Sequence, residues 1–318
     1  MSRRSWSSLF RSLFGGVSNH QTKQAQRPKL ALEKMEDRTT PAAFAFDAGT
    51  GTLTIDLDNT NEALTLTSQG GGHYVFTSTN NFTGTNQTGL TGNGTTTLTI
   101  TNALATPHIS INDTAGGTSV AFGTSTGDYA DNMDIVLNNA GAGGVAVNAA
   151  TTFSSANFSV SSASSVAVNA PLTANFVRLI TTNFVNVASN ITSGSSGVII
   201  ATNTTGTATG DTDGISVTNN AQVTTTNNGN IILFGTGGAG NGNNNEGVIL
   251  SAGTLVSANG TGTVTITGTG GSGGGSGNFG IDLNGSVTSG SGDISLNGTY
   301  GNLGTSQTNS NGVVIFTG

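Results

Sequence analysis

The chain of 318 residues contains no cysteine, which excludes thiol catalysis and cysteine-ligated metal sites. Charged residues are also scarce, at 8% of the sequence, where soluble domains usually have about a quarter. After Arg38 there is no lysine and only one arginine, Arg178. This part of the chain therefore lacks a phosphate-binding Gly-Lys-Ser/Thr loop and a basic patch, and we expect no nucleic-acid partner.

The few basic residues are concentrated at the amino terminus. Eight of the nine lie between Arg3 and Arg38, so that residues 1–38 carry a net charge of +5 (8 − 3), whereas the remainder carries −12 (1 − 13). A basic leader ahead of an acidic body is typical of an export or membrane-proximal segment that precedes a secreted passenger. Residues 1–18 place Trp6, Phe10 and Phe14 on one helical face, which predicts an amphipathic helix that contacts a membrane interface; a disordered basic tail is the alternative.

Regular repetition dominates the second half of the chain. Glycines open successive copies at Gly214, Gly247, Gly280 and Gly312, and their spacing is nearly constant. Within each copy three short apolar clusters alternate with period two and are separated by Gly, Asn, Ser and Thr, which indicates strands and turns. Three short strands per repeat predict an all-β fold, a parallel β-solenoid in which each strand pairs with its equivalent one coil later, and a right-handed coil is favoured.

Two stretches of this sequence resemble known families. The segments "GISVTNNAQVTTTNNGNIILFG" and "GVILSAGTLVSANGTGTVTITG" resemble the loosely repeating coils of filamentous-haemagglutinin-type adhesins. Near the amino terminus, "LEKMEDRTTPA" resembles the Leu-Glu-x-Leu-Glu-Asp-Arg-x-x-Pro motif of large planctomycete surface proteins, with Met35 in place of the second leucine. That resemblance implies an exported, cell-surface or extracellular protein. The residues that match the motif are Leu32, Glu33, Glu36, Asp37, Arg38, Pro41 and Ala42.

The length of the coils indicates where the chain has been enlarged. From Val145 the apolar clusters advance by about 20 residues per coil, and later by about 30 to 33. The added residues follow the third cluster each time, in segments that begin at Thr202, Gly235 and Gly268. We therefore expect these insertions to stack along a single edge of the solenoid.

These patterns divide the chain into three parts. Residues 1–42 form the basic leader with the export-associated motif, and residues 141–318 form the regular coils, with a carboxyl terminus that we expect to be truncated. Residues 43–140 contain alternating strands at irregular spacing, which fits either imperfect first coils, or a cap, or a separate antiparallel β-domain. We expect early coils.

No catalytic set emerges from the polar residues. Glu246 is the only acidic residue of its coil, Asp282 and Asp293 fall on different strands, and the histidines are scattered. Acidic clusters are more typical of turns than of weak calcium sites, and no cofactor is expected. The weak calcium candidates are Asp128, Asp131, Asp134, Asp211 and Asp213.

The leading interpretation is a non-enzymatic, adhesin-like or structural repeat protein that is extracellular or associated with the cell surface and outer membrane. Its long polar corner loops would bind extracellular polysaccharide or other cell-surface components, and an open last coil would allow end-to-end self-association. The alternative is a fragment of a β-helix polysaccharide-processing enzyme whose catalytic coils lie outside this chain.

Overall fold

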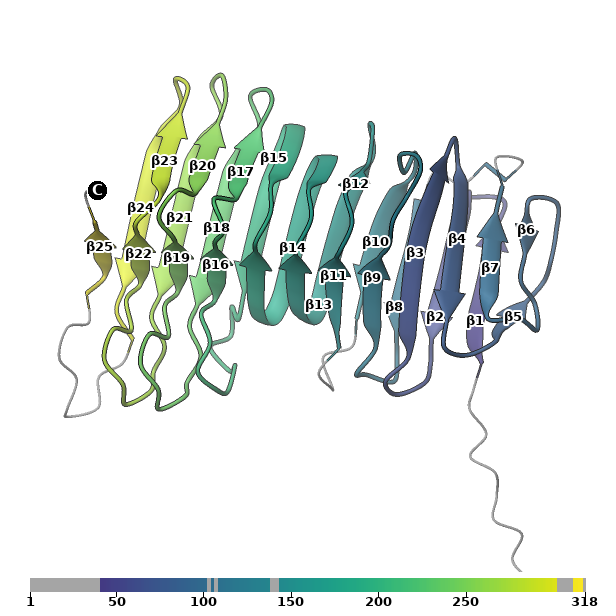
Figure 1. Cartoon of the computed structure of the whole chain (residues 1–318), viewed down its shortest axis with the longest axis horizontal. Helices are drawn as coiled ribbons and strands as arrows, with labels where there is room; N and C mark the ends of the chain where they lie inside the picture. Colours follow the sequence, from purple (N-terminus) through teal and green to yellow (C-terminus); the bar gives the residue numbers. More distant parts are fainter. Residues whose placement is uncertain (1–40, 102–103, 106–107, 138–142, 302–310, 317–318) are drawn as a thin grey trace, which may run out of the picture. The chain divides into compact units, whose positions relative to one another are not determined.

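The computed structural model describes residues 41–101, 104–105, 108–137, 143–301 and 311–316. These residues contain 25 β-strands and no helix, so the predicted all-β fold is confirmed. Residues 39–318 form one compact unit, whereas the leader, with its predicted amphipathic helix and most of the export-associated motif, lies outside the described residues. Most strands pair in parallel with a strand of the next coil, as a solenoid requires, and Figure 1 shows the coils side by side.

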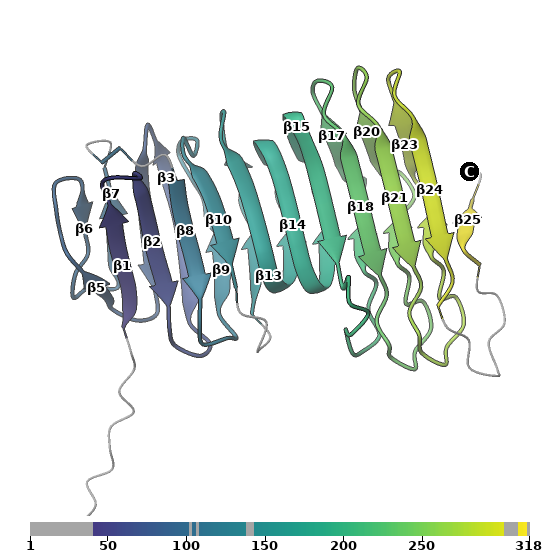
Figure 2. The same cartoon turned by 180° about the vertical axis from the view of Figure 1, so that it is seen from behind.

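The coil has three faces, and each face is a ladder of parallel strands. Face A is visible in Figure 2, where β18, β21 and β24 lie side by side and β8 lies nearer the amino-terminal end of the same face. A single continuous strand passes around a corner in three coils, so that parts of β13, β14 and β15 belong to more than one face. In order along the ladder, face A contains β2 (Thr52–Leu57), β8 (His108–Asp113), β10 (Asn132–Val136), β13 (Asn157–Val168), β14 (Leu172–Val187), β15 (Ile191–Thr202), β18 (Ile231–Thr236), β21 (Val264–Thr269) and β24 (Ile294–Thr299).

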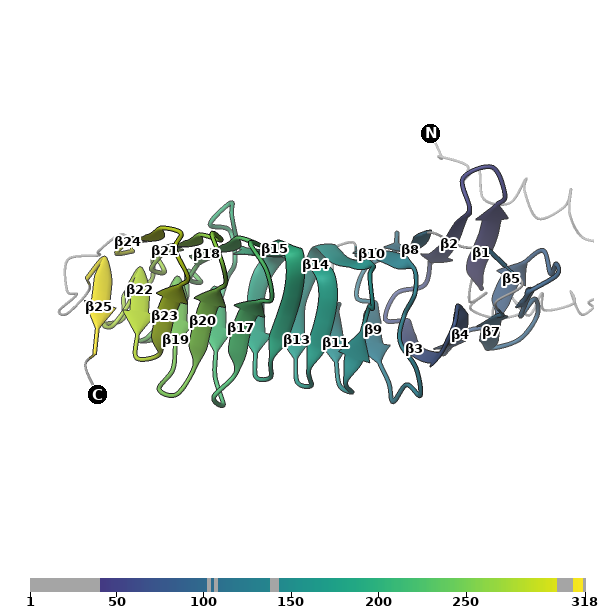
Figure 3. The same cartoon turned by 90° about the horizontal axis from the view of Figure 1, so that it is seen from above.

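Faces B and C are built in the same way. Face B contains β3 (Ala63–Gly70), β9 (Ser119–Phe122), β11 (Gly144–Val147), the later parts of β13 and β14, β16 (Ile215–Val217), β19 (Val248–Leu250), β22 (Ile281–Leu283) and β25 (Val313–Ile315). Face C contains β12 (Thr151–Thr152), the first parts of β14 and β15, β17 (Gln222–Thr225), β20 (Leu255–Ala258) and β23 (Ser286–Ser289). In Figure 3 the strands of this face lie in chain order along the coils.

The alternation seen in the sequence decides which side chains form the core. Along face A, Leu179, Ile200, Leu233 and Ile266 lie opposite one another in register, and each is fully buried. Residues between them, such as Ile232, point outwards. Because the period of a strand is two, this register stacks the buried branched apolar side chains of face A on their equivalents in the next coil.

The amino-terminal end of the solenoid combines parallel and antiparallel pairing. β2 and β3 already belong to faces A and B, because they pair in parallel with β8 and β9. Antiparallel pairs join β1 to β2, β3 to β4, β4 to β7 and β6 to β7. The first coils and an antiparallel end are therefore parts of one compact unit. The additional strands are β1 (Ala42–Asp47), β4 (His73–Ser78), β5 (Phe82–Gly84), β6 (Leu90–Thr91) and β7 (Thr97–Ile100).

Stacked aromatic rings fill the core where the antiparallel end meets the coils. The rings of Tyr74 and Tyr129 are 5.5 Å apart and nearly parallel, and Tyr129 lies 4.9 Å from Phe153. Phe153 in turn stacks on Phe158 at 5.3 Å. Together these rings form a continuous apolar layer through successive coils, and such aromatic pairs add stability beyond the area they bury.

Candidate functional site

The enlarged corners connect face A to face B in the later coils. We call residues 203–214, 237–247 and 270–280 corner loops 1, 2 and 3. They stack coil on coil, as the sequence predicts: the Gly240 N–H donates to the Gly210 carbonyl at 2.9 Å, and the Asn244 N–H donates to the Ser276 carbonyl at 3.0 Å. A β-carbon added at Gly273 would lie 1.4 Å from the Gly240 carbonyl oxygen. The glycine-rich composition of the loops therefore allows this close backbone approach.

Two buried asparagines hold the corner loops in shape. Asn278 donates to the carbonyl oxygens of Gly273 and Gly275, both at 3.3 Å, so its amide closes corner loop 3 from inside. Its Oδ1 accepts the N–H of Asn245 at 3.0 Å, which ties loop 3 to loop 2. Asn245 repeats the two carbonyl bonds one coil earlier, where its amide donates to Gly240 at 3.4 Å and to Gly242 at 3.1 Å, and both asparagine side chains are fully buried. These bonds satisfy backbone carbonyl groups that no strand ladder could reach.

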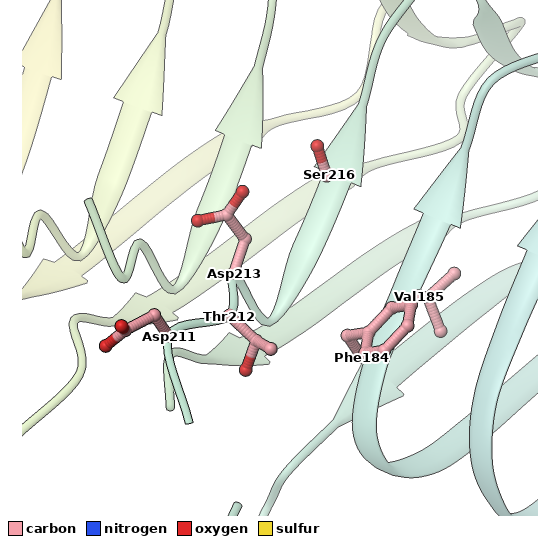
Figure 4. Close-up of a pocket in the computed structure, with 6 residues that line it drawn as sticks. All are labelled: Phe184, Val185, Asp211, Thr212, Asp213 and Ser216. Atoms are coloured by element: carbon pink, nitrogen blue, oxygen red, sulfur yellow. The ribbon is translucent and has the colours of Figure 1, made fainter. Parts of the chain in front are cut away.

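An acidic pocket of about 250 Å³ opens beside corner loop 1 (Figure 4). Corner loop 1 contributes two carboxylates and a hydroxyl, and the adjoining strands contribute an aromatic ring on β14 and a hydroxyl on β16. The loop folds over the strands because it must return from face A to face B across this corner. The lining residues are Phe184, Val185, Asp211, Thr212, Asp213 and Ser216.

An acid pair, formed by the half-buried Asp213 of the pocket wall and the buried Glu246, lies at this pocket. Glu246 is 3% exposed and occupies the position of Asp213 one coil later, and its backbone N–H donates to Asp213 Oδ1 at 3.2 Å. Burial, a side-chain hydrogen bond to Asp213 and the negative charge of Asp213 raise the pKa of Glu246 to about 9. The Glu246 carboxyl is therefore neutral at pH 7 and donates its proton to the Asp213 carboxylate. Burial and the charge of Asp213 also raise the pKa of Asp282.

The burial of Glu246 limits the chemistry of the pair. A neutral carboxyl next to a carboxylate is the arrangement that serves acid–base catalysis when both groups reach a substrate. Glu246 is closed off from solvent, so its proton holds loops 1 and 2 together instead. Among the described residues no three His, Asp or Glu side chains converge in a way that could hold a metal ion.

The calcium candidates of the sequence lie in two places and have protein partners. Asp211 accepts the Gly242 N–H at 2.6 Å, so it bridges loops 1 and 2, and it lines the acidic pocket together with Asp213. The other three are near the amino-terminal coils. Asp128 accepts the Ser154 hydroxyl at 2.7 Å, Asp131 accepts the Tyr74 hydroxyl at 2.7 Å, and Asp134 lies 3.2 Å from Nε2 of His108.

The sequence interpretation missed two of these relationships. It treated Glu246 as isolated because no other acidic residue shares its coil, yet its separation from Asp213 equals the repeat period and signals that the two stack. It also treated His108 as scattered, although His108 and Asp134 lie on the adjacent strands β8 and β10. No regular period connects those two, so the sequence carried no signal for the second pair.

Within the part of the chain that the structure describes, no helix is long and apolar enough to cross a lipid bilayer. Comparison of the chain with protein-family models, with curated proteins and with solved structures gives no match.

Proposed function

We propose that this chain is a non-enzymatic, exported surface or extracellular protein that binds polysaccharide or other cell-surface components through its stacked corner loops. The observation that carries the proposal is the polar edge formed by these loops, in which equivalent segments recur in successive coils and are held by buried asparagines. A periodic array of weak polar contacts suits a long, repeating ligand, because several contacts to one polymer add their effects.

The charge division supports the location. Residues 1–38 are basic, whereas the body that follows is acidic and contains a single arginine, as expected for an exported passenger behind a leader. The planctomycete-type motif that ends at the start of β1 supports the same location. Fractionation of cells that produce the full chain or a variant without residues 1–42 tests this. The proposal requires the full chain in the envelope or medium and the truncated chain in the cytoplasm; cytoplasmic accumulation of both would contradict it.

Binding by the corner loops has its own test. Asn241 and Ser272 are exposed at the tips of loops 2 and 3, so a double alanine variant should weaken retention on cell-surface polysaccharide. Thr261 is also exposed but lies on the opposite connection, between faces C and A, and Thr261→Ala provides the matched control. Equal retention of the two variants would argue against the corner loops as the binding edge.

The acid pair favours one alternative from another class, a polysaccharide-processing enzyme of which this chain is a part. Its test is the release of reducing sugar from a panel of polysaccharides by the full chain and by Glu246→Gln. Release that depends on Glu246 would favour the enzyme, despite the burial of that side chain. Absence of release together with loop-dependent binding would favour the surface protein.

A further inference from the structure

A second groove lies on the outer surface of face A, far along the chain from the corner loops. It has a volume of about 300 Å³ and crosses four neighbouring strands, β8, β10, β13 and β14. Apart from the buried Met133, its walls are outward side chains of the ladder, and they carry amide, carboxylate, hydroxyl, imidazole and guanidinium groups together with one phenyl ring. The side chains that line the groove include His108, Asn132, Asp134, Asn157, Phe176 and Arg178.

The parallel register arranges these side chains in two rows. One row runs from His108 past Asn132 and Asn157 to Phe176, and a second runs from Asp134 past Ser159 to Arg178. Neighbouring strands are about 4.8 Å apart, so the first row is about 14 Å long and runs across the strands. An elongated ligand that lies along the solenoid axis would contact both rows.

Arg178 is the feature that points to a ligand. It is the only lysine or arginine after Arg38, in an acidic body, yet no described residue forms an ion pair or hydrogen bond with its guanidinium. Asp134, two strands away, pairs with His108 instead, at 3.2 Å. The five guanidinium donors are therefore available, and their planar fork matches the geometry of a carboxylate.

The other wall groups match the rest of a sugar. Phe176 lies just before Arg178 on the outer surface and is partly exposed, so its ring offers an apolar platform beside the cation. The Asn157 backbone N–H donates to Asn132 Oδ1 at 2.9 Å, and the Asn175 side-chain amide donates to Asn157 Oδ1 at 3.1 Å. Those bonds fix the two amides at the groove, where they can bind hydroxyl groups. A ring for stacking, fixed amides and one cation are the combination that binding sites for polar ligands present.

We propose that this groove binds a carboxylated sugar of an extracellular polysaccharide, with the sugar carboxylate on Arg178, the pyranose face on Phe176 and hydroxyl groups on Asn132, Asn157 and Asp134. In this pose the Asp134 carboxylate accepts hydrogen bonds from sugar hydroxyl groups. The site is separate from the corner loops and does not depend on their function.

The test is calorimetric titration of the full chain with oligogalacturonate, and with the same oligomer in methyl-esterified form. We expect binding of the acid form that weakens with added salt, and little binding of the ester. Arg178→Gln should weaken binding by about tenfold to a hundredfold, which is the effect of losing a hydrogen bond to a charged group. The affinity of Arg178→Lys should lie between those of the native chain and Arg178→Gln. Phe176→Thr, which keeps a residue suited to a strand, should also weaken binding.

Ile232 supplies the control. It lies in the same outward row as Arg178, two strands further along face A, and is 39% exposed. Ile232→Thr should leave the affinity unchanged, and circular dichroism confirms that every variant is folded. Equal affinity for acid and ester, no binding of the acid, or an Arg178→Gln variant that binds as the native chain does would each overturn the proposal.

Discussion

Replacement of Glu246 by glutamine should change how the stability of the protein depends on pH. The folded protein holds a proton on Glu246 up to a pKa of about 9, whereas the unfolded chain releases it near the ordinary value of 4.5. Between these two values the folded state binds more protons, so the free energy of unfolding falls as pH rises. Glutamine resembles the protonated acid and still donates a hydrogen bond to Asp213, but it does not titrate. The free energy of unfolding of the variant should therefore lack the part of its pH dependence that comes from Glu246.

The magnitude follows from proton linkage. One proton contributes a slope of at most about 1.4 kcal/mol per pH unit. Asp213, which is the partner of Glu246, is partly exposed to solvent, and this lowers the slope below that maximum. We therefore expect the native chain to lose about 1–3 kcal/mol of its free energy of unfolding through Glu246 between about pH 5 and pH 8. Glu62 and Asp282, whose pKa values are raised chiefly by burial, add to the slope at acid pH in both proteins. The difference between the native chain and the variant therefore isolates Glu246.

Urea unfolding followed by circular dichroism at a series of pH values measures this difference. Glu246→Gln should match the native chain near pH 5 and be the more stable protein near pH 8. Asp293 is exposed in the connection between faces C and A, so Asp293→Asn should parallel the native chain and serves as the control. Parallel curves for the native chain and Glu246→Gln would mean that Glu246 is ionised in the folded protein, and would refute the account of the acid pair.

Three further substitutions test the packing of the coils. Leu233→Ala removes a fully buried side chain between Ile200 and Ile266, and we expect a loss of about 2–5 kcal/mol in the free energy of unfolding, measured with urea; a loss below about 1 kcal/mol would contradict the stacked core. Gly273→Ala places a β-carbon against the Gly240 carbonyl and should lower the melting temperature. Gly274→Ala should not, because the atom nearest to its added β-carbon, Asn241 Oδ1, is 3.8 Å away. Equal melting temperatures for the two variants would show that loops 2 and 3 are not in contact. Asn278→Ala removes the hydrogen bonds that close loop 3, and we expect the free energy of unfolding to fall by about 1–3 kcal/mol. Hydrogen exchange at the Asn245 N–H should become faster, because this N–H loses its acceptor. Unchanged exchange at that position would exclude the bond between the two asparagines.

The strands and the enlarged corner could be predicted because their signals are local. Alternation of apolar residues, as in Ile231 and Leu233, marks a strand wherever it lies, and the equal spacing of Gly214, Gly247 and Gly280 gives the repeat period. Once the clusters are aligned, the extra residues fall between the same two faces in every coil. The stacking of Asp213 on Glu246 was within reach for the same reason, since their separation equals that period.

The pairing register of the shorter coils was not visible in this way. Along face A, Ile111 pairs with Ile135, Ile135 with Val160, and Val160 with Leu179, so the separation between partners along the chain differs from one coil to the next. Each separation depends on how much of the chain the intervening corners take up, and corners of glycine, serine and threonine adapt to several lengths. The alternation of apolar residues alone could therefore not predict which side chains lie together in the groove around Arg178.

By itself, the sequence determined the fold class, the approximate positions of the strands and the edge at which the loops stack, because each follows from a short-range period. Tertiary structure alone decided the antiparallel pairing of β1, β4, β6 and β7, the neutral state of Glu246 and the groove around Arg178. Those features depend on which residues of different coils become neighbours. The neighbours are set by the length of chain that each corner takes up, and therefore by all the corners together rather than by any one segment.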